Sequence, residues 1–301
     1  MTTERTDMRF ASYLNLAGVP TWGAEQGGML HDLGPSGLGV ASTLKAAIVD
    51  ARLADLPDLG TAPTQPTDGT TFLPVIGDPG KIICIGVNYR THQSETGRAD
   101  VPAPTVFIRY PDTLAAHGAD LPIPSETAMY DYEGELALVV GAPASHVSEA
   151  DAWDVVAGYT AFNDLSARDW QRHTGQWTPG KNFPASGPFG PFYTPAGDLG
   201  DITDLVLETR VNGEVRQHAR LSDLIFDIPA IIAYVTTFTP LAAGDVIVTG
   251  TPRRGGPVPH ATAVPLRRGR RRGGDLQARD APQPPRLLTR TPSRGRTSHD
   301  T

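Results

Sequence analysis

The sequence predicts a β-rich α+β fold, and two observations lead to this fold class. Short apolar, β-branched runs recur between turns rich in Gly, Pro and Asn, while only a few stretches have helical spacing. The chain also lacks an alternating βαβ pattern, a G-x-G-x-x-G motif and a P-loop. A strand-dominated domain is therefore expected, and nucleotide binding has no support.

Composition restricts the class further. The 301 residues are 39% hydrophobic, enough for a packed core, and no apolar run approaches the roughly 20 residues of a membrane span. The first residues are polar, so no signal peptide is expected. Cys84 is the single cysteine and lies among aliphatic residues, which predicts a buried structural thiol and favours a cytoplasmic protein without membrane partners.

Charge is distributed unevenly along the chain. From Thr251 to Thr301 there are 12 arginines and 3 aspartates, a net charge of +9, so that the total of −7 leaves −16 for residues 1–250. An acidic body of this kind is not expected to bind nucleic acid.

The first part of the chain divides into a small unit and a connection. Residues 1–56 are expected to form a small N-terminal α+β domain, with short strands near 8–13 and 29–33. Residues 42–50 have helical spacing, with Ser42 as the expected N-cap. Residues 57–72 are rich in Pro, Thr and Gly and are interpreted as a linker.

Residues 73–252 are expected to form the main domain. Strands are predicted at 81–86, 105–109, 133–140 and 158–162, and helices after the capping sequence Ser148-Glu149-Ala150-Asp151 and at 229–238. Asn212-Gly213 is the strongest hairpin signal of the chain, between runs at 205–211 and 214–220.

Glu133 and Glu135 organise the functional interpretation. Residues i and i+2 of a strand point to the same face, and the apolar run that follows predicts a buried strand. Two buried like charges need neutralisation, and Asp164, at the end of a later strand, would complete an oxygen-only set suited to Mg²⁺, Mn²⁺ or Ca²⁺. Spacing alone leaves a solvent-facing strand as the alternative.

His92 and Glu95 form a second candidate pair. On a helical turn residues three apart share a face, and a carboxylate that orients an imidazole is the usual arrangement of a general base. A solvated polar loop is the alternative reading of this stretch.

Five ordered motifs resemble the fumarylacetoacetate hydrolase family, over about residues 75–252. They are Lys81-Ile82-Ile83-Cys84-Ile85-Gly86-Val87-Asn88-Tyr89, Asp131-Tyr132-Glu133-Gly134-Glu135-Leu136, Asn163-Asp164-Leu165-Ser166-Ala167-Arg168-Asp169, Trp177-Thr178-Pro179-Gly180-Lys181 and Thr249-Gly250-Thr251-Pro252. The resemblance implies a mixed β-sandwich roll, a homodimer, and one Mg²⁺ or Mn²⁺ per subunit.

The same resemblance implies roles for single residues. Glu133, Glu135 and Asp164 match the metal ligands, whereas His92 and Glu95 match a catalytic pair on a mobile helix. Further matches are Lys181 to an active-site lysine, and Gln171 and Thr251 to substrate-binding residues; Arg168 and Asp169 are assigned to structural pairing.

The family acts on β-diketo and α-keto acids, which implies a chemistry through a metal-stabilised enolate. The expected reaction is C–C hydrolysis of an acylpyruvate or fumarylacetoacetate-like β-diketo acid, with water activated by His92 and Glu95. Isomerisation of 2-hydroxy-dienedioates and decarboxylation of oxaloacetate are alternatives, because the same enolate serves all three.

Two departures from the family pattern stand out. Arg109, expected to bind substrate, occupies a position where the family often has Lys. Residues 253–301 are rich in Arg, Pro and Gly and lack strand periodicity, which predicts disorder or a shifted reading frame with loss of the closing strands. Two alternatives are an inactive scaffold and a tail that binds nucleic acid or an acidic partner.

Overall fold

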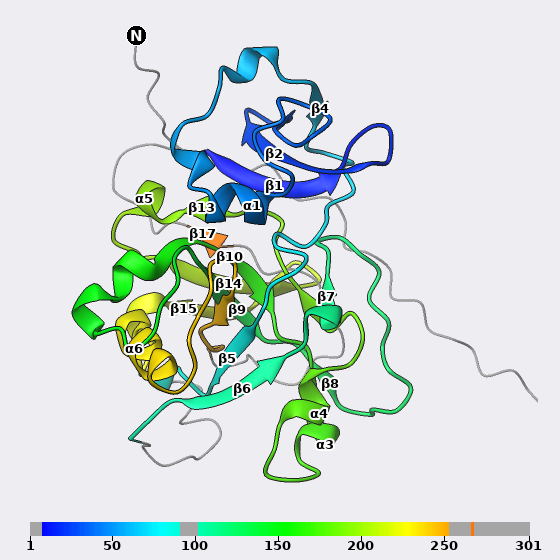
Figure 1. Cartoon of the computed structure of the whole chain (residues 1–301). Helices are drawn as coiled ribbons and strands as arrows, with labels where there is room; N and C mark the ends of the chain where they lie inside the picture. Colours follow the sequence, from blue (N-terminus) through cyan, green and yellow to red (C-terminus); the bar gives the residue numbers. More distant parts are fainter. Residues whose placement is uncertain (1–7, 91–101, 253–265, 268–301) are drawn as a thin grey trace, which may run out of the picture.

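The computed structural model describes residues 8–90, 102–252 and 266–267 and confirms the β-rich α+β class (Figure 1). No helix within these ranges is long and apolar enough to cross a membrane. Cys84 is fully buried and is a free thiol, as predicted.

The N-terminal unit is built on a four-stranded antiparallel sheet. Its strands pair in chain order and are β1 (Arg9–Leu14), β2 (Pro20–Gln26), β3 (Met29–Asp32) and β4 (Thr64–Pro66). The stretch 57–72, expected as a linker, thus supplies β4, together with the short 3-10 helix η2 (Leu59–Thr61).

Helix α1 (Leu44–Val49) and the 3-10 helix η1 (Arg52–Ala54) complete the N-terminal unit. The prediction that Ser42 caps α1 is wrong, because Thr43 has the extended backbone of a cap and its side chain accepts the Ala46 N–H.

A six-stranded sheet forms the centre of the molecule, in the order β13-β10-β9-β16-β5-β6. Among the described strands of this sheet, β16 and β5 pair in parallel and the other neighbours pair antiparallel. The bounds are β5 (Ile82–Gly86), β6 (Thr105–Arg109), β9 (Gly134–Val140), β10 (Val156–Asn163), β13 (Thr194–Pro195) and β16 (Val246–Val248).

Strand β9 is buried along its whole length because the sheet is covered on both faces. Ala137 and Val139 belong to a core shared with the N-terminal unit, whereas Leu136, Leu138 and Val140 belong to a second core. The second core includes helix α6 (Ile228–Phe238), which packs against the 3-10 helix η4 (Glu149–Val155). Figure 1 shows the blue N-terminal unit on one side of this sheet and the yellow α6 on the other.

Shorter elements lie around the central sheet. The predicted hairpin is confirmed as β14 (Val206–Val211) and β15 (Glu214–Arg220), and Asn212 and Gly213 adopt the positive φ that this turn requires. The remaining elements are η3 (Pro111–Thr113), β7 (Leu114–Ala115), β8 (Tyr130–Asp131), β11 (Ser166–Ala167), α3 (Arg168–Gln171), α4 (Thr178–Lys181), β12 (Gly187–Pro188), α5 (Ala196–Leu199), η5 (Leu221–Asp223) and β17 (Leu266–Arg267).

Strand β17 comes from the arginine-rich stretch 253–301 and pairs antiparallel with β14. The rest of that stretch lies outside the described residues, so its predicted disorder or shifted frame stays a prediction.

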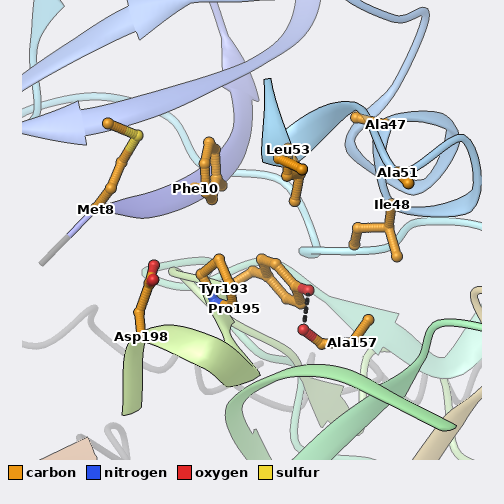
Figure 2. Close-up of a pocket in the computed structure, with 11 residues that line it drawn as sticks. Met8, Phe10, Ala47, Ile48, Ala51, Leu53, Ala157, Tyr193, Pro195 and Asp198 are labelled. Atoms are coloured by element: carbon orange, nitrogen blue, oxygen red, sulfur yellow. Dashed lines mark hydrogen bonds between the residues drawn. The ribbon is translucent and has the colours of Figure 1, made fainter. Parts of the chain in front are cut away.

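The N-terminal unit and the central sheet meet at a largely apolar junction. Phe10 and Tyr193 exchange two backbone hydrogen bonds of 2.8 and 2.7 Å, and the Tyr193 hydroxyl donates to the Ala157 carbonyl at 2.7 Å. Figure 2 shows the pocket of about 260 Å³ beside this contact, with Met8, Ile48 and Leu53 on its walls. These contacts tie the two units together.

Candidate metal centre

Three acidic side chains converge where β9 begins and β10 ends. Glu133 immediately precedes β9, which begins one residue later than predicted; Glu135 is the second residue of β9, and Asp164 follows β10. The two strands are antiparallel neighbours, and the Asp164 N–H donates to the Glu133 carbonyl at 2.8 Å. One oxygen from each carboxylate lies within 4.8 Å of the others, and the residues are only 0–4% exposed.

Three cationic side chains surround these carboxylates. Lys181, at the end of α4, places its Nζ 2.5 Å from Glu133 Oε2 and 2.5 Å from Asp164 Oδ2. Arg109, at the end of β6, donates to Asp164 Oδ1 at 2.5 Å, and Arg168 of α3 donates to Glu133 Oε1 at 2.5 Å. Each oxygen of Glu133 and of Asp164 therefore faces a cation.

Glu135 has a different environment. Its Oε2 accepts the Gly250 N–H at 2.6 Å, and among the described residues no cationic side chain forms an ion pair with it. Burial, followed by the Asp164 and Glu133 carboxylates, raises the pKa of Glu135 well above its ordinary value. A cation placed between the three carboxylates would relieve this repulsion.

Lys181 is held in its charged form. Burial by itself lowers the pKa of an ammonium group, but the Asp164 and Glu133 carboxylates outweigh burial and raise the pKa of Lys181. Arg168 also pairs with Asp131 at 2.9 Å, so that among the described residues four carboxylates meet three cations, a formal charge of −1.

The donor set fits a hard divalent ion. The cluster offers only carboxylate oxygens within the described residues, and Mg²⁺, Mn²⁺ and Ca²⁺ prefer such ligands. Its negative charge also needs a cation for compensation. Glu133, Glu135 and Asp164 are therefore the residues that would hold the ion.

The structure accounts for some of the other predicted site residues. Gln171 accepts a hydrogen bond from Arg168 at 2.9 Å, which places it beside the cluster. Thr251 is 3% exposed; its hydroxyl donates to the Gly134 carbonyl at 3.0 Å and accepts from Gln217 at 2.7 Å. Their substrate-binding roles stay predictions, and His92 and Glu95 lie outside the described residues.

Arg109 has contacts that its predicted role does not include. It is 2% exposed, and its guanidinium donates to Asp164 and to the Ser186 hydroxyl. The contact with Asp164 fixes the orientation of that carboxylate. Substrate binding by Arg109 stays a prediction.

Several residues near the cluster were not identified as site residues from sequence. Arg168 forms the structural pairing assigned to it, but that pairing includes Glu133 itself. The Tyr130 hydroxyl is buried without a hydrogen-bond partner in the described part of the chain. Burial raises the pKa of Tyr130 to about 12, partly offset by the Arg109 guanidinium. Gln217 lies on the hairpin strand β15, far from the carboxylates in sequence, and no sequence pattern marks it as a site residue.

Comparison with known families agrees with this site. The family described as fumarylacetoacetate (FAA) hydrolase C-terminal matches residues 81–281, well over half of the chain. This protein belongs to the fumarylacetoacetate hydrolase family, as the ordered motifs predicted. The match extends beyond Pro252, where the resemblance noted from sequence ended.

Individual relatives carry more specific names. An oxaloacetate tautomerase of Bacillus subtilis is 45% identical over 181 residues, which are 59% of this chain and 60% of that protein. A mitochondrial oxaloacetate tautomerase of Rattus norvegicus is 35% identical over 63% of this chain and 61% of its own length. The aligned region thus spans about three fifths of these relatives.

Solved structures show the same fold. A fumarylacetoacetate hydrolase from Exiguobacterium antarcticum superposes with a TM-score of 0.72 and 33% identity, over 82% of this chain and 88% of that chain. A maleylpyruvate hydrolase from Sphingobium sp. SYK-6, in complex with manganese(II) and pyruvate, has a TM-score of 0.70 and 26% identity, over 83% and 90%.

Proposed function

We propose that this protein is a divalent-metal-dependent enzyme that forms an enolate from a small α-keto acid. The observation that carries the proposal is the buried carboxylate set of Glu133, Glu135 and Asp164 with the Lys181 ammonium against two of its members. Mg²⁺ is the proposed ion, with Mn²⁺ or Ca²⁺ as substitutes. A bound ion would withdraw electron density from the keto and carboxylate oxygens of the substrate.

The charges of the site favour an anionic substrate. A divalent ion would change the formal charge of the cluster from −1 to +1, which a substrate carboxylate would neutralise. Lys181 provides a fixed positive charge where negative charge develops on an enolate oxygen. Arg109 and Arg168 already donate to Asp164 and Glu133.

Keto–enol tautomerisation of a short keto diacid such as oxaloacetate is the first candidate reaction. It is supported by the names of the Bacillus and rat relatives and requires only proton transfer to and from the enolate. His92 with Glu95 is the proposed proton-transfer pair, on the basis of the family resemblance.

Hydrolysis of a C–C bond in a β-diketo acid is the second candidate. The structural similarity to the manganese- and pyruvate-bound maleylpyruvate hydrolase favours it. Here His92 and Glu95 would deprotonate a water molecule that attacks the remote carbonyl, and the bond breaks with the electron pair left on the enolate fragment.

The test uses the full chain with oxaloacetate, acylpyruvates and 2-hydroxy-dienedioates, each with Mg²⁺, after EDTA treatment, and after Mg²⁺ is added back. Enol absorbance follows tautomerisation, and product analysis follows hydrolysis, isomerisation and decarboxylation. We expect activity that EDTA abolishes and Mg²⁺ restores. Full activity in EDTA would contradict the metal-dependent proposal.

His92→Ala then separates the two candidate reactions from decarboxylation. Both hydrolysis and tautomerisation should be lost, because each needs a proton-transfer group, whereas decarboxylation of oxaloacetate should persist. Equal loss of all three activities would contradict a role of His92 limited to proton transfer in hydrolysis and tautomerisation.

A further inference from the structure

Gln217 connects the β14–β15 hairpin to the carboxylate set, although it lies far from it in sequence. It is 1% exposed, and its side-chain amide forms three hydrogen bonds. Its Oε1 accepts the Gly134 N–H at 2.9 Å, and its Nε2 donates to the Thr251 hydroxyl at 2.7 Å and to the Pro252 carbonyl at 2.9 Å. Every contact joins β15 to another part of the site.

The first of these contacts fixes the backbone between the two glutamates. Gly134 separates Glu133 from Glu135, so the orientation of its two peptide groups sets where both carboxylates point. Gln217 binds the Gly134 N–H, and the Gly134 carbonyl accepts the Thr251 hydroxyl at 3.0 Å. The Gln217–Thr251 pair thus holds this residue at both of its backbone polar groups.

The remaining contacts fix the loop that follows β16. Gly250 donates its N–H to Glu135 at 2.6 Å, and Gln217 binds the next two residues of that loop through Thr251 and Pro252. The Gln217 amide therefore sets the distance between this loop and β9. It thereby positions the Gly250 N–H that donates to Glu135.

These observations point to a function beyond packing of the hairpin. Thr209 lies directly opposite Gln217 on β14 and is equally buried, but its hydroxyl has no hydrogen-bond partner among the described residues. Of this buried cross-strand pair, Gln217 forms the hydrogen bonds that lead to the carboxylates, and Thr209 does not.

We infer that Gln217 is a positioning residue for the metal centre: it holds Glu133 and Glu135 in the geometry that binds the ion. The inference rests on the proposed metal-dependent function. Substitution of a residue that orients metal ligands typically weakens metal affinity by about 10–100-fold.

The test compares Gln217→Met, which keeps the length of the side chain without its amide, with Thr209→Val as the matched control. Mn²⁺ affinity is measured by isothermal titration calorimetry, and the Mn²⁺ electron paramagnetic resonance spectrum reports ligand geometry. We expect Gln217→Met to bind Mn²⁺ about 10–100-fold more weakly, with an altered spectrum. Thr209→Val should keep the wild-type affinity and spectrum.

Wild-type affinity and spectrum in folded Gln217→Met would overturn the inference and leave the proposed function intact, whereas a wild-type protein that binds no Mn²⁺ would overturn both. If Gln217→Met does not fold, Thr251→Val replaces it, because it removes the hydrogen bond from Gln217 to Thr251 and the hydrogen bond from Thr251 to the Gly134 carbonyl. A folded Thr251→Val with wild-type affinity and spectrum would equally overturn the inference.

Discussion

Two regions of this molecule bury carboxylates in opposite ways. In the N-terminal unit, Asp32 stands alone and is satisfied by neutral donors, the Thr21 hydroxyl at 2.6 Å, the Gly34 N–H at 2.9 Å and the Ser36 hydroxyl at 3.1 Å. At the start of β9, three carboxylates share one place and face cationic side chains.

The difference distinguishes a structural carboxylate from a site with capacity for a ligand. A single buried carboxylate needs only local hydrogen bonds, which the turn after β3 supplies. Three converging carboxylates repel each other, and a bound cation would remove this repulsion.

The largest effect is expected for Glu133→Gln, which keeps the shape of the side chain and removes one charged ligand. Mn²⁺ affinity measured by titration calorimetry should fall by more than about 100-fold, beyond the 10–100-fold typical of residues that only orient ligands. Enzymatic turnover should fall with it.

Asp32→Asn is the control for Glu133→Gln. It should leave Mn²⁺ affinity unchanged and lower the free energy of unfolding by about 1–3 kcal/mol, because a buried acceptor network is disturbed. An equal loss of Mn²⁺ affinity in both variants would remove the distinction between the two regions.

The second effect concerns Lys181→Met. Loss of the ammonium should lower kcat by about 10²–10³-fold, the range found when one charge-stabilising group is removed from an active site. Mn²⁺ affinity should be unchanged or higher, because a competing positive charge is gone. Steady-state kinetics at saturating Mn²⁺ together with calorimetry measure both quantities. A collapse of Mn²⁺ affinity would show that Lys181 supports the ligands and does not act on the substrate.

The smallest effect is expected at Asp169, which, like Asp32, has neutral donors. The Thr127 hydroxyl, followed by the Ala128 and Trp170 N–H groups, lowers the pKa of Asp169 below its ordinary value. Because the folded state lowers this pKa, Asp169 stabilises the fold at neutral pH, and its contribution is lost as pH falls through the lowered pKa.

Asp169→Asn should therefore lower the free energy of unfolding at pH 7 by well under about 1 kcal/mol, because solvent screens the interactions of this partly exposed carboxylate. Urea unfolding of the wild-type protein and the variant at decreasing pH measures the difference, which should shrink on acidification. A difference that stays constant down to the acid limit of folding would contradict the assignment of this pKa.

The sequence indicated the centre of the site because its signals are local. Strand alternation and the burial of the following apolar run predicted that Glu133 and Glu135 share a face, and the strand-end position of Asp164 predicted the third carboxylate. The Asn-Gly turn likewise fixed the β14–β15 hairpin.

The features that the sequence did not indicate depend on which elements meet in space. The ends of β6 and β10 come together across the site, so Arg109 contacts Asp164, and no periodicity encodes that meeting. Gln217 has ordinary hairpin neighbours in sequence, and its amide reaches the Gly134 N–H only because the hairpin folds against β9, which β14 contacts. Ser42 and Thr43 are both good N-cap residues, so the sequence does not determine at which of the two the helix begins; in the structure Thr43 is the cap.

The ion pairs of Lys181 affect how the proposed metal ion would be exchanged. In small domains that fold only when a metal binds, the metal ion alone neutralises the charge of its ligands. Here the Lys181 ammonium and the Arg109 and Arg168 guanidinium groups are built into the strands and helices and already counter most of the ligand charge. The proposed ion would therefore bind and leave reversibly without unfolding the protein, and its concentration would set the occupancy of the site.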